Sequence, residues 1–125
     1  MTALTAARAL AGLAEIGADP AYEARRAGVP EDLKAEFAWR VSLDAVERLF
    51  ERGIELAGPD FPLRARPPRQ EDNRSPVNLY CRTRATVRDA FQAMNDLSGL
   101  ITDGYAIAFE ERPGEGWVLW HGPAR

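Results

Sequence analysis

The chain has 125 residues, which fits one domain whose core can hold together without disulfides or a structural metal. Its apolar share of 46%, its charged share of 28% and its net charge of −3 are ordinary for a globular protein and argue against a generally basic nucleic-acid binder. The single cysteine, Cys81, excludes an internal disulfide, and no apolar run approaches the ~18 residues of a membrane span. The sequence therefore predicts a cytoplasmic protein that does not engage a membrane.

Helical spacing dominates the start of the chain. Apolar residues recur three and four positions apart over residues 4–14, and Gly17 is placed to end this first helix. Asp19 and Pro20 then supply an N-cap and a proline at the first helical position, where its missing N–H costs nothing. This second helix is expected to close at Gly28.

Two more helices are expected before residue 60. A short one should begin within residues 29–32, where acidic side chains suit the positive end of a helix dipole. The next has the clearest pattern in the chain, with Ser42 as N-cap, Asp44 in the first turn and Gly58-Pro59 as its stop. Its apolar stripe, which should be buried, comprises Leu43, Val46, Leu49, Phe50, Ile54 and Ala57.

The chain changes character at residues 59–76, where five prolines argue against a long regular element. We expect an exposed loop around the stretch ARPPRQEDNRSP. The apolar run at residues 77–81 is too short to assign by its period. A further helix should follow Thr86, with Asp89 three residues on, and should end between Gly99 and Gly104. Its expected buried stripe comprises Val87, Ala90, Phe91, Met94 and Leu97.

The last part of the chain changes from helical to strand periodicity. Residues 105–109 and 117–120 are β-prone, and the proline and glycines of residues 112–116 predict a hairpin turn between them. Tyr105, Ile107 and Phe109 should share one face, and neither face is clearly polar. An isolated hairpin is marginal in water, so we expect that helices cover it, that another chain pairs with it, or that the sequence is part of a longer protein.

This order of elements predicts an α+β fold, with a mainly helical N-terminal part and a small antiparallel β-hairpin at the C-terminal end. The expected organisation is a single domain over residues 1–125. It would comprise a helical part (1–58), the Pro- and Arg-rich loop (59–76), and a helix plus hairpin (77–125).

The sequence offers little for catalysis. An active site needs a nucleophile, an acid–base group or a metal cluster within mutual reach, and the chain has one histidine, His121, and one cysteine, Cys81. No metal-ligand spacing appears, and neither GxGxxG nor GxxxxGK[ST] is present. We therefore expect no enzyme activity, no metal and no cofactor.

Positive charge is concentrated in one central segment. Residues 64–88 carry seven arginines against two acidic residues, whereas the segments on either side are acidic. The prolines in this segment, and the presence of only one aromatic residue, Tyr80, among its arginines, argue against a recognition helix. Direct DNA contact through these arginines is one hypothesis for the function, and it predicts that the affinity for DNA falls steeply as the salt concentration rises.

Four stretches carry a resemblance to a known family. They are LAEIGADPAYEARRAGVPEDL, VSLDAVERLFERGIELAGPDFPLRA, TRATVRDAFQAMNDLSGLITDGYAIAFEE and GWVLWHG. In their order and spacing the chain resembles the N-terminal, arabinose-binding-like effector domain of AraC-family transcription regulators, over nearly its whole length. Members of this family also carry a pair of helix-turn-helix motifs, which these 125 residues do not contain, and the ARPPRQEDNRSP insert departs from the family pattern.

The resemblance implies a bacterial regulator domain that senses an unidentified small-molecule effector and forms a homodimer, with DNA contacted only through a C-terminal domain absent from this chain. A ligand could shift its conformational equilibrium only by the difference in its affinity for two states. The alternative is a stand-alone protein–protein interaction module with no small ligand, which would use the hairpin edge and its tryptophans.

The candidate ligand-binding residues combine aromatic surface with a few polar groups, as small-molecule sites do. They are Tyr80, Arg82, Tyr105, Trp117, Trp120 and His121. Arg82 is the sharpest single candidate, because its planar guanidinium could hold an anionic group of a ligand by two hydrogen bonds.

Overall fold

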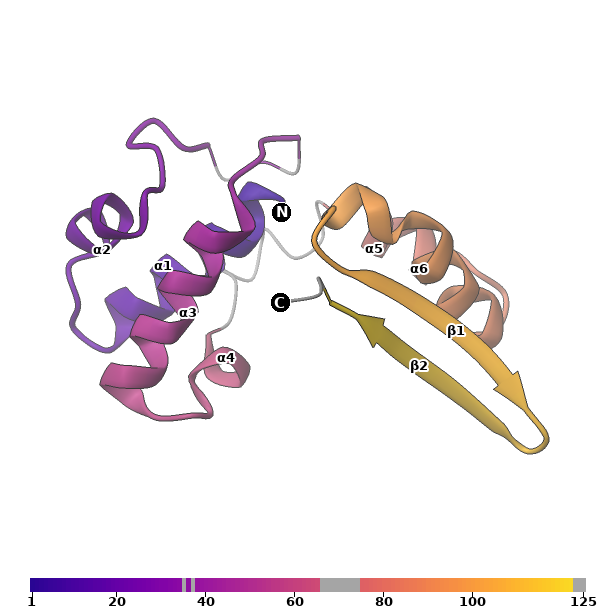
Figure 1. The fold of residues 1–125 in the computed structure, drawn as a ribbon. Helices are drawn as coiled ribbons and strands as arrows, with labels where there is room; N and C mark the ends of the chain where they lie inside the picture. The colour runs from indigo at the N-terminus through magenta and orange to yellow at the C-terminus, as the bar shows by residue number, and fades with distance from the viewer. Residues whose placement is uncertain (35, 37, 66–74, 123–125) are drawn as a thin grey trace. The chain divides into compact units, whose positions relative to one another are not determined.

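The computed structural model describes residues 1–34, 36, 38–65 and 75–122, and the chain divides into two compact units, Met1–Asp72 and Asn73–Arg125. The α+β prediction is confirmed: the described residues form six helices, mostly in the N-terminal part, and a two-stranded antiparallel sheet at the C-terminal end (Figure 1). Among the described residues, none of the helices has the length and hydrophobicity of a membrane-spanning segment. That the two units make one domain stays a prediction.

The first two helices form where the sequence predicts them. They are α1 (Ala3–Glu15) and α2 (Pro20–Ala27). The Asp19 carboxylate accepts a hydrogen bond from the Ala21 N–H at 3.0 Å, which satisfies one of the free donors at the start of α2. Gly28 closes this helix with φ of 81°, a left-handed conformation that glycine adopts without strain.

The segment after Gly28 differs from the prediction, because a turn replaces the expected third helix at residues 29–34. Val29 is buried, and its N–H reaches back to the Ala24 carbonyl at 2.9 Å, so its backbone completes the end of α2. One hydrogen bond follows, from the Leu33 N–H to the Pro30 carbonyl. A single turn is too short to offset the cost of nucleating a helix.

The third helix, α3 (Leu43–Ala57), confirms the helix that the sequence predicts most clearly, but Ile54 of its expected buried stripe is 39% exposed. The Ser42 hydroxyl accepts from the Ala45 N–H at 3.1 Å, and the helix stops at Gly58. A four-residue helix, α4 (Phe61–Arg64), lies within the stretch where we expected a loop, since a proline fits the first turn of a helix. Residues 66–74 of that expected loop lie outside the described residues.

The core of Met1–Asp72 is built on close approach between helices. The face of α1 that is buried is made mostly of alanines, so α3 and α4 can pack near its backbone. The Phe61 ring of α4 is only 1% exposed and packs edge-on against Phe50, with ring centroids 6.2 Å apart. It fills the space left by Gly53 of α3, where an added Cβ would lie 2.1 Å from the ring.

In Asn73–Arg125, helices precede a hairpin. They are α5 (Pro76–Arg82), the run too short to assign from sequence, and α6 (Val87–Ile101). The Thr86 hydroxyl accepts from the Asp89 N–H at 3.1 Å, as the capping pattern predicts. The hairpin consists of β1 (Ala106–Arg112) and β2 (Glu115–His121).

One face of the hairpin packs on α6. Phe109 stacks on Phe91 of α6 with ring centroids 5.6 Å apart, and the register places Ile107 on the same face. The expected stripe of α6 is only partly buried, because Val87 at its first turn is 74% exposed. The two strands therefore pack against α6 through a few aromatic and aliphatic contacts.

The tight seat of Phe61 gives the first testable prediction. Gly53→Ala should lower the free energy of unfolding by about 1–3 kcal/mol, because the new methyl overlaps a buried ring that has no room to move. The measurement is urea denaturation followed by circular dichroism. The matched control is Gly99→Ala on α6, where an added Cβ meets nothing within 4 Å, so it should stabilise by about 0.5–1 kcal/mol. Equal effects of the two substitutions would contradict this packing.

Candidate functional site

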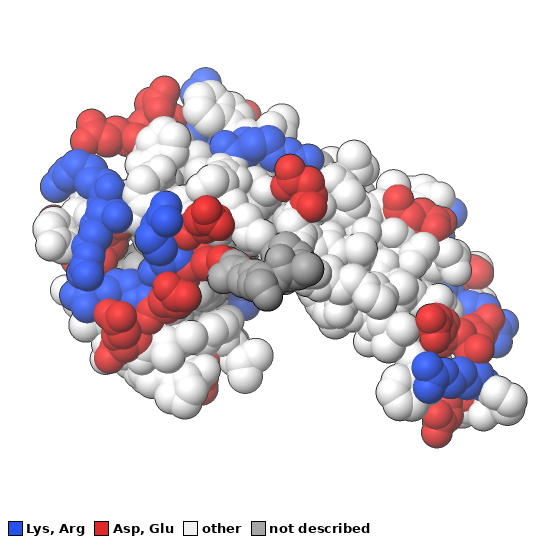
Figure 2. All heavy atoms as spheres, in the orientation of Figure 1, with Lys and Arg blue, Asp and Glu red and all other residues white. Residues whose placement is uncertain are grey.

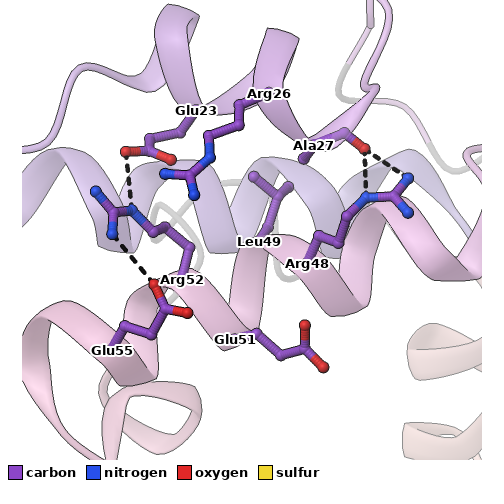
Figure 3. A pocket seen from close by; sticks show the side chains of 8 residues that line it. All are labelled: Glu23, Arg26, Ala27, Arg48, Leu49, Glu51, Arg52 and Glu55. Atoms are coloured by element: carbon purple, nitrogen blue, oxygen red, sulfur yellow. Dashed lines mark hydrogen bonds and ion pairs between the residues drawn. The ribbon is translucent and has the colours of Figure 1, made fainter.

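A small charged pocket lies between α2 and α3 (Figure 3). Its volume is about 140 Å³, and its floor includes the buried Leu49. The lining residues are Glu23, Arg26, Ala27, Arg48, Leu49, Glu51, Arg52 and Glu55. Three arginines and three glutamates thus face one opening, and their formal charges cancel.

Arg48 joins the end of α2 to the middle of α3. Its Nε and Nη2 both donate to the Ala27 carbonyl, at 3.0 and 2.8 Å. Ala27 is the last residue of α2, and the last carbonyls of a helix have no partner within the helix. The cationic donor also suits the negative end of the α2 dipole. Arg48 is therefore occupied in holding the helix end.

A second ion pair holds the middle of α2. The Arg52 Nε lies 3.2 Å from the Glu23 carboxylate, which is almost fully buried, and its Nη1 donates to Glu55 at 3.1 Å. The hydrogen bonds that Arg52 donates raise its pKa above the ordinary value, and the bond to Glu55 has a larger effect than the bond to Glu23. The buried carboxylate thus keeps a charged partner at every physiological pH. Both charges serve the contact between α2 and α3.

The size and the internal pairing of this pocket argue against a site for an effector. Ligand pockets commonly enclose ~300–1,000 Å³ and are mostly apolar. The charged pocket is smaller, and Arg48 and Arg52 are already engaged. We interpret it as the polar joint that fixes α2 on α3.

A larger, mostly apolar hollow lies on another face of α2. Its volume is about 540 Å³, and it is bounded by α1, α2 and the turn that follows Gly28. The lining residues are Ala7, Leu10, Pro20, Ala21, Ala24, Arg25, Val29, Pro30, Glu31 and Leu33. Arg25 and Glu31 form the charged part of its lining, with their charged groups 4.0 Å apart. Its size, apolar lining and few polar groups are those of a small-molecule site.

A third hollow, of about 500 Å³, lies between α6 and the hairpin. The stacked Phe91 and Phe109 and the strand residue Val118 supply its apolar surface. An ion pair between Arg88 and Glu111 crosses from α6 to β1 beside it. The arginines that line this hollow are paired with glutamates, Arg88 with Glu111 and Arg112 with Glu110.

The predicted ligand-binding residues all lie in Asn73–Arg125. Tyr80 and Arg82 are on α5, and both are exposed. The guanidinium of Arg84 stacks over the Tyr80 ring, 4.0 Å from its centroid, and also donates to the Tyr80 hydroxyl at 3.2 Å. Tyr80 is thus engaged by an arginine four residues further along the chain, beyond the end of α5.

The hairpin separates the other predicted residues. Trp117 and His121 lie on one face of β2 and Trp120 on the other, because successive strand residues alternate. The Trp117 indole donates to Glu115 at 2.9 Å, and Tyr105 precedes β1 and packs near Gly122. None of the six predicted residues lines the three hollows. Their role in ligand binding stays a prediction.

Sequence reasoning missed the apolar hollow beside α2. Leu10 and Ala24 have the same helical spacing as core residues, so the periodic pattern assigns them to the core. The signal that could have found the hollow is Gly28, whose left-handed φ of 81° ends α2, because residues on both sides of it line the hollow. Among the described residues, no three His, Cys, Asp or Glu side chains gather as a metal site would require.

Comparison with known proteins identifies the family to which the chain belongs. Residues 17–125 match the family described as the N-terminal arabinose-binding domain of AraC transcription regulators. The match covers most of the chain, so the protein belongs to this family, and the resemblance seen in its sequence is confirmed. No curated protein and no solved structure matches the chain.

The buried ion pair gives the second prediction. Arg52→Leu should lower the midpoint of thermal unfolding more than Glu23→Leu does, because only the first leaves a buried carboxylate without its cation. The double variant should recover part of the loss. Differential scanning calorimetry measures all three, and Glu55→Gln, which alters only the exposed partner, should have the smallest effect. Strictly additive losses would show that the pair is not coupled.

Proposed function

We propose that this protein is the non-catalytic, effector-sensing domain of an AraC-type transcription regulator. The observation that carries the proposal is its membership of the arabinose-binding family over residues 17–125. The apolar hollow beside α2 supports it, since about 540 Å³ suits a molecule the size of a sugar or a small organic acid.

The hollow is the effector site in this proposal. The apolar side chains of Leu10, Ala24 and Leu33 would contact the carbon face of the ligand, and Arg25 and Glu31 would hydrogen-bond its polar groups. A pentose such as arabinose presents both kinds of surface, and the family is named for it. Pentoses are therefore the first ligands to test.

Signalling would follow from where the hollow lies. Arg25 belongs to α2 and Glu31 to the turn after it, so a ligand touching both would stabilise one arrangement of these two segments. A ligand shifts an equilibrium by the difference in its affinity for the two states. In this proposal the domain also forms a homodimer, and a separate C-terminal domain contacts DNA.

An alternative function is a protein–protein interaction module without a small ligand. Exposed aromatic side chains of β2 favour it, because Trp117 is 42% and Trp120 67% exposed and tryptophan is enriched at interface hot spots. A protein that binds no small molecule but forms a stable complex through β2 would fit this alternative.

The third prediction concerns effector binding. A pentose present at about 100 times its Kd should stabilise the folded protein by about 2.7 kcal/mol, which thermal-shift measurements detect as a higher unfolding temperature. Ala21→Trp should abolish this shift, because Ala21 is an exposed residue of α2 whose larger replacement fills the hollow. Ala14→Trp, at an exposed position on α1 outside that lining, should keep the shift.

Arg82→Ala tests the sequence-based site in the same assay. Loss of the shift in Arg82→Ala with retention in Ala21→Trp would move the effector site to Asn73–Arg125. If no pentose, hexose or small organic acid shifts the parent protein, the sensing proposal fails.

A further inference from the structure

The two strands of the hairpin differ in how their outer edges are covered. The Asn95 side chain of α6 accepts a hydrogen bond from the Phe109 N–H of β1 at 3.2 Å, so a helix residue occupies the middle of the β1 edge. In the part of the chain that the structure describes, no strand or side chain pairs with the opposite edge, on β2. An uncovered edge presents a row of donors and acceptors to another strand.

The turn fixes which backbone groups point outward. Arg112 and Glu115 flank the two-residue turn, so they form a hydrogen-bonded pair. Pairs alternate along an antiparallel ladder, which makes Phe109 and Val118 a non-hydrogen-bonded pair with their N–H and C=O groups directed away from each other. The Asn95 bond to the Phe109 N–H agrees with this assignment.

On β2 the outward groups belong to Gly116, Val118 and Trp120. Natural proteins block such edges with lysine, proline or a β-bulge. The sequence of β2, EGWVLWH, contains neither lysine nor proline, and its register with β1 runs without interruption. Within Glu115–His121 this edge therefore lacks these three features.

We propose that β2 pairs antiparallel with β2 of a second copy, in a register centred on Val118, to give a four-stranded sheet across a two-fold axis. This names the surface for the homodimer of the proposed function and rests on it. The register uses all seven residues of β2. Val118 would form a hydrogen-bonded pair with Val118 of the partner subunit, as would Gly116 with Trp120 of the partner subunit.

The side chains complement one another in this register. Trp120 would lie across from Gly116 of the partner subunit, where a large ring covers a residue without a side chain. Glu115 would lie across from His121 of the partner subunit, a carboxylate beside a ring that can donate to it. Each contact occurs twice by symmetry. Glu115 uses one oxygen for the Trp117 indole, which leaves the other available.

The distribution of charge around β2 is also compatible with pairing between two identical copies. Figure 2 shows the charged side chains of the hairpin gathered at its far end, with uncharged surface along the rest of its visible face. Two copies meeting along β2 would therefore bring little like charge together near the axis. The exposed apolar area of Trp120 and Val118 would be reduced on pairing.

The fourth prediction removes one outward donor. Val118→Pro deletes an N–H that the β1–β2 ladder does not use, and proline is tolerated at such edge positions. We expect light scattering after size exclusion to give twice the 13.8 kDa chain mass for the parent protein at about 100 μM and a single chain mass for Val118→Pro. Val118→Thr, a matched β-branched residue that keeps the N–H, should stay dimeric. Far-UV circular dichroism checks that the hairpin is retained.

A charge exchange tests the register by a second route. His121→Glu would place two carboxylates opposite each other at both ends of the pairing and should raise the dimer Kd roughly tenfold. Glu115→Lys added to His121→Glu should restore the parent Kd, because opposite charges again face each other.

Three outcomes would overturn the proposal. They are a monomeric parent protein at 100 μM, a dimer that persists in Val118→Pro, and a failure of the double charge exchange to restore affinity. The effector assay is independent, because the hollow beside α2 contains no residue of β2. If a pentose raises the unfolding temperature of a protein that is monomeric at 100 μM, the sensing proposal stands and the pairing proposal fails. If the parent protein is a dimer, Val118→Pro is a monomer and no ligand raises the unfolding temperature of either, the pairing proposal stands and the sensing proposal fails.

Discussion

The packing of the Phe61 ring is the contact on which the first unit depends. The ring comes from a helix of only four residues, which could not form alone, and it sits against Gly53 of α3 and near Gly12 of α1. Two glycines on two helices thus leave room for one ring. Arg8 of α1 reinforces the same place by donating to the Pro62 and Ala65 carbonyls. The pairing of α1 with α3, and everything built on it, follows from this close approach.

The attachment of α2 to α3 depends on polar contacts more than on close packing. Apart from Ala27 it buries little apolar surface, and its contacts with α3 include the Arg48 bonds to a helix-end carbonyl and the ion pair of Arg52 with Glu23. Hydrogen-bonded contacts of this sort fix direction more than they add stability. Polar contacts therefore contribute much of the attachment of α2, the helix that borders both the charged pocket and the apolar hollow.

Local chemistry explains what the sequence could predict. Asp19, Ser42 and Thr86 were recognisable as helix starts because each cap bond joins residues two or three positions apart. The failures are non-local. The turn at residues 29–34 depends on Val29 reaching back to α2, and the apolar hollow depends on the chain doubling back at Gly28. A periodic pattern shows that a side chain is apolar, but it does not show whether the space beside it is filled.

The same limit applies to the hairpin. Alternation predicted that Ile107 and Phe109 share a face, and the register confirms it, whereas Tyr105, predicted to join them, precedes β1. The covering of one edge by Asn95 could not be foreseen, because it joins residues 14 positions apart through a side chain.

That single amide has a consequence for how large an assembly can grow. A hairpin with two open edges could add strands on both sides without end, as fibrils do. Here the Asn95 side chain occupies the centre of the β1 edge, so a strand that paired with β1 would have to displace its hydrogen bond with the Phe109 N–H. Among the described residues, β2 offers the edge that no side chain covers, so two copies that pair along β2 as proposed would form a closed dimer.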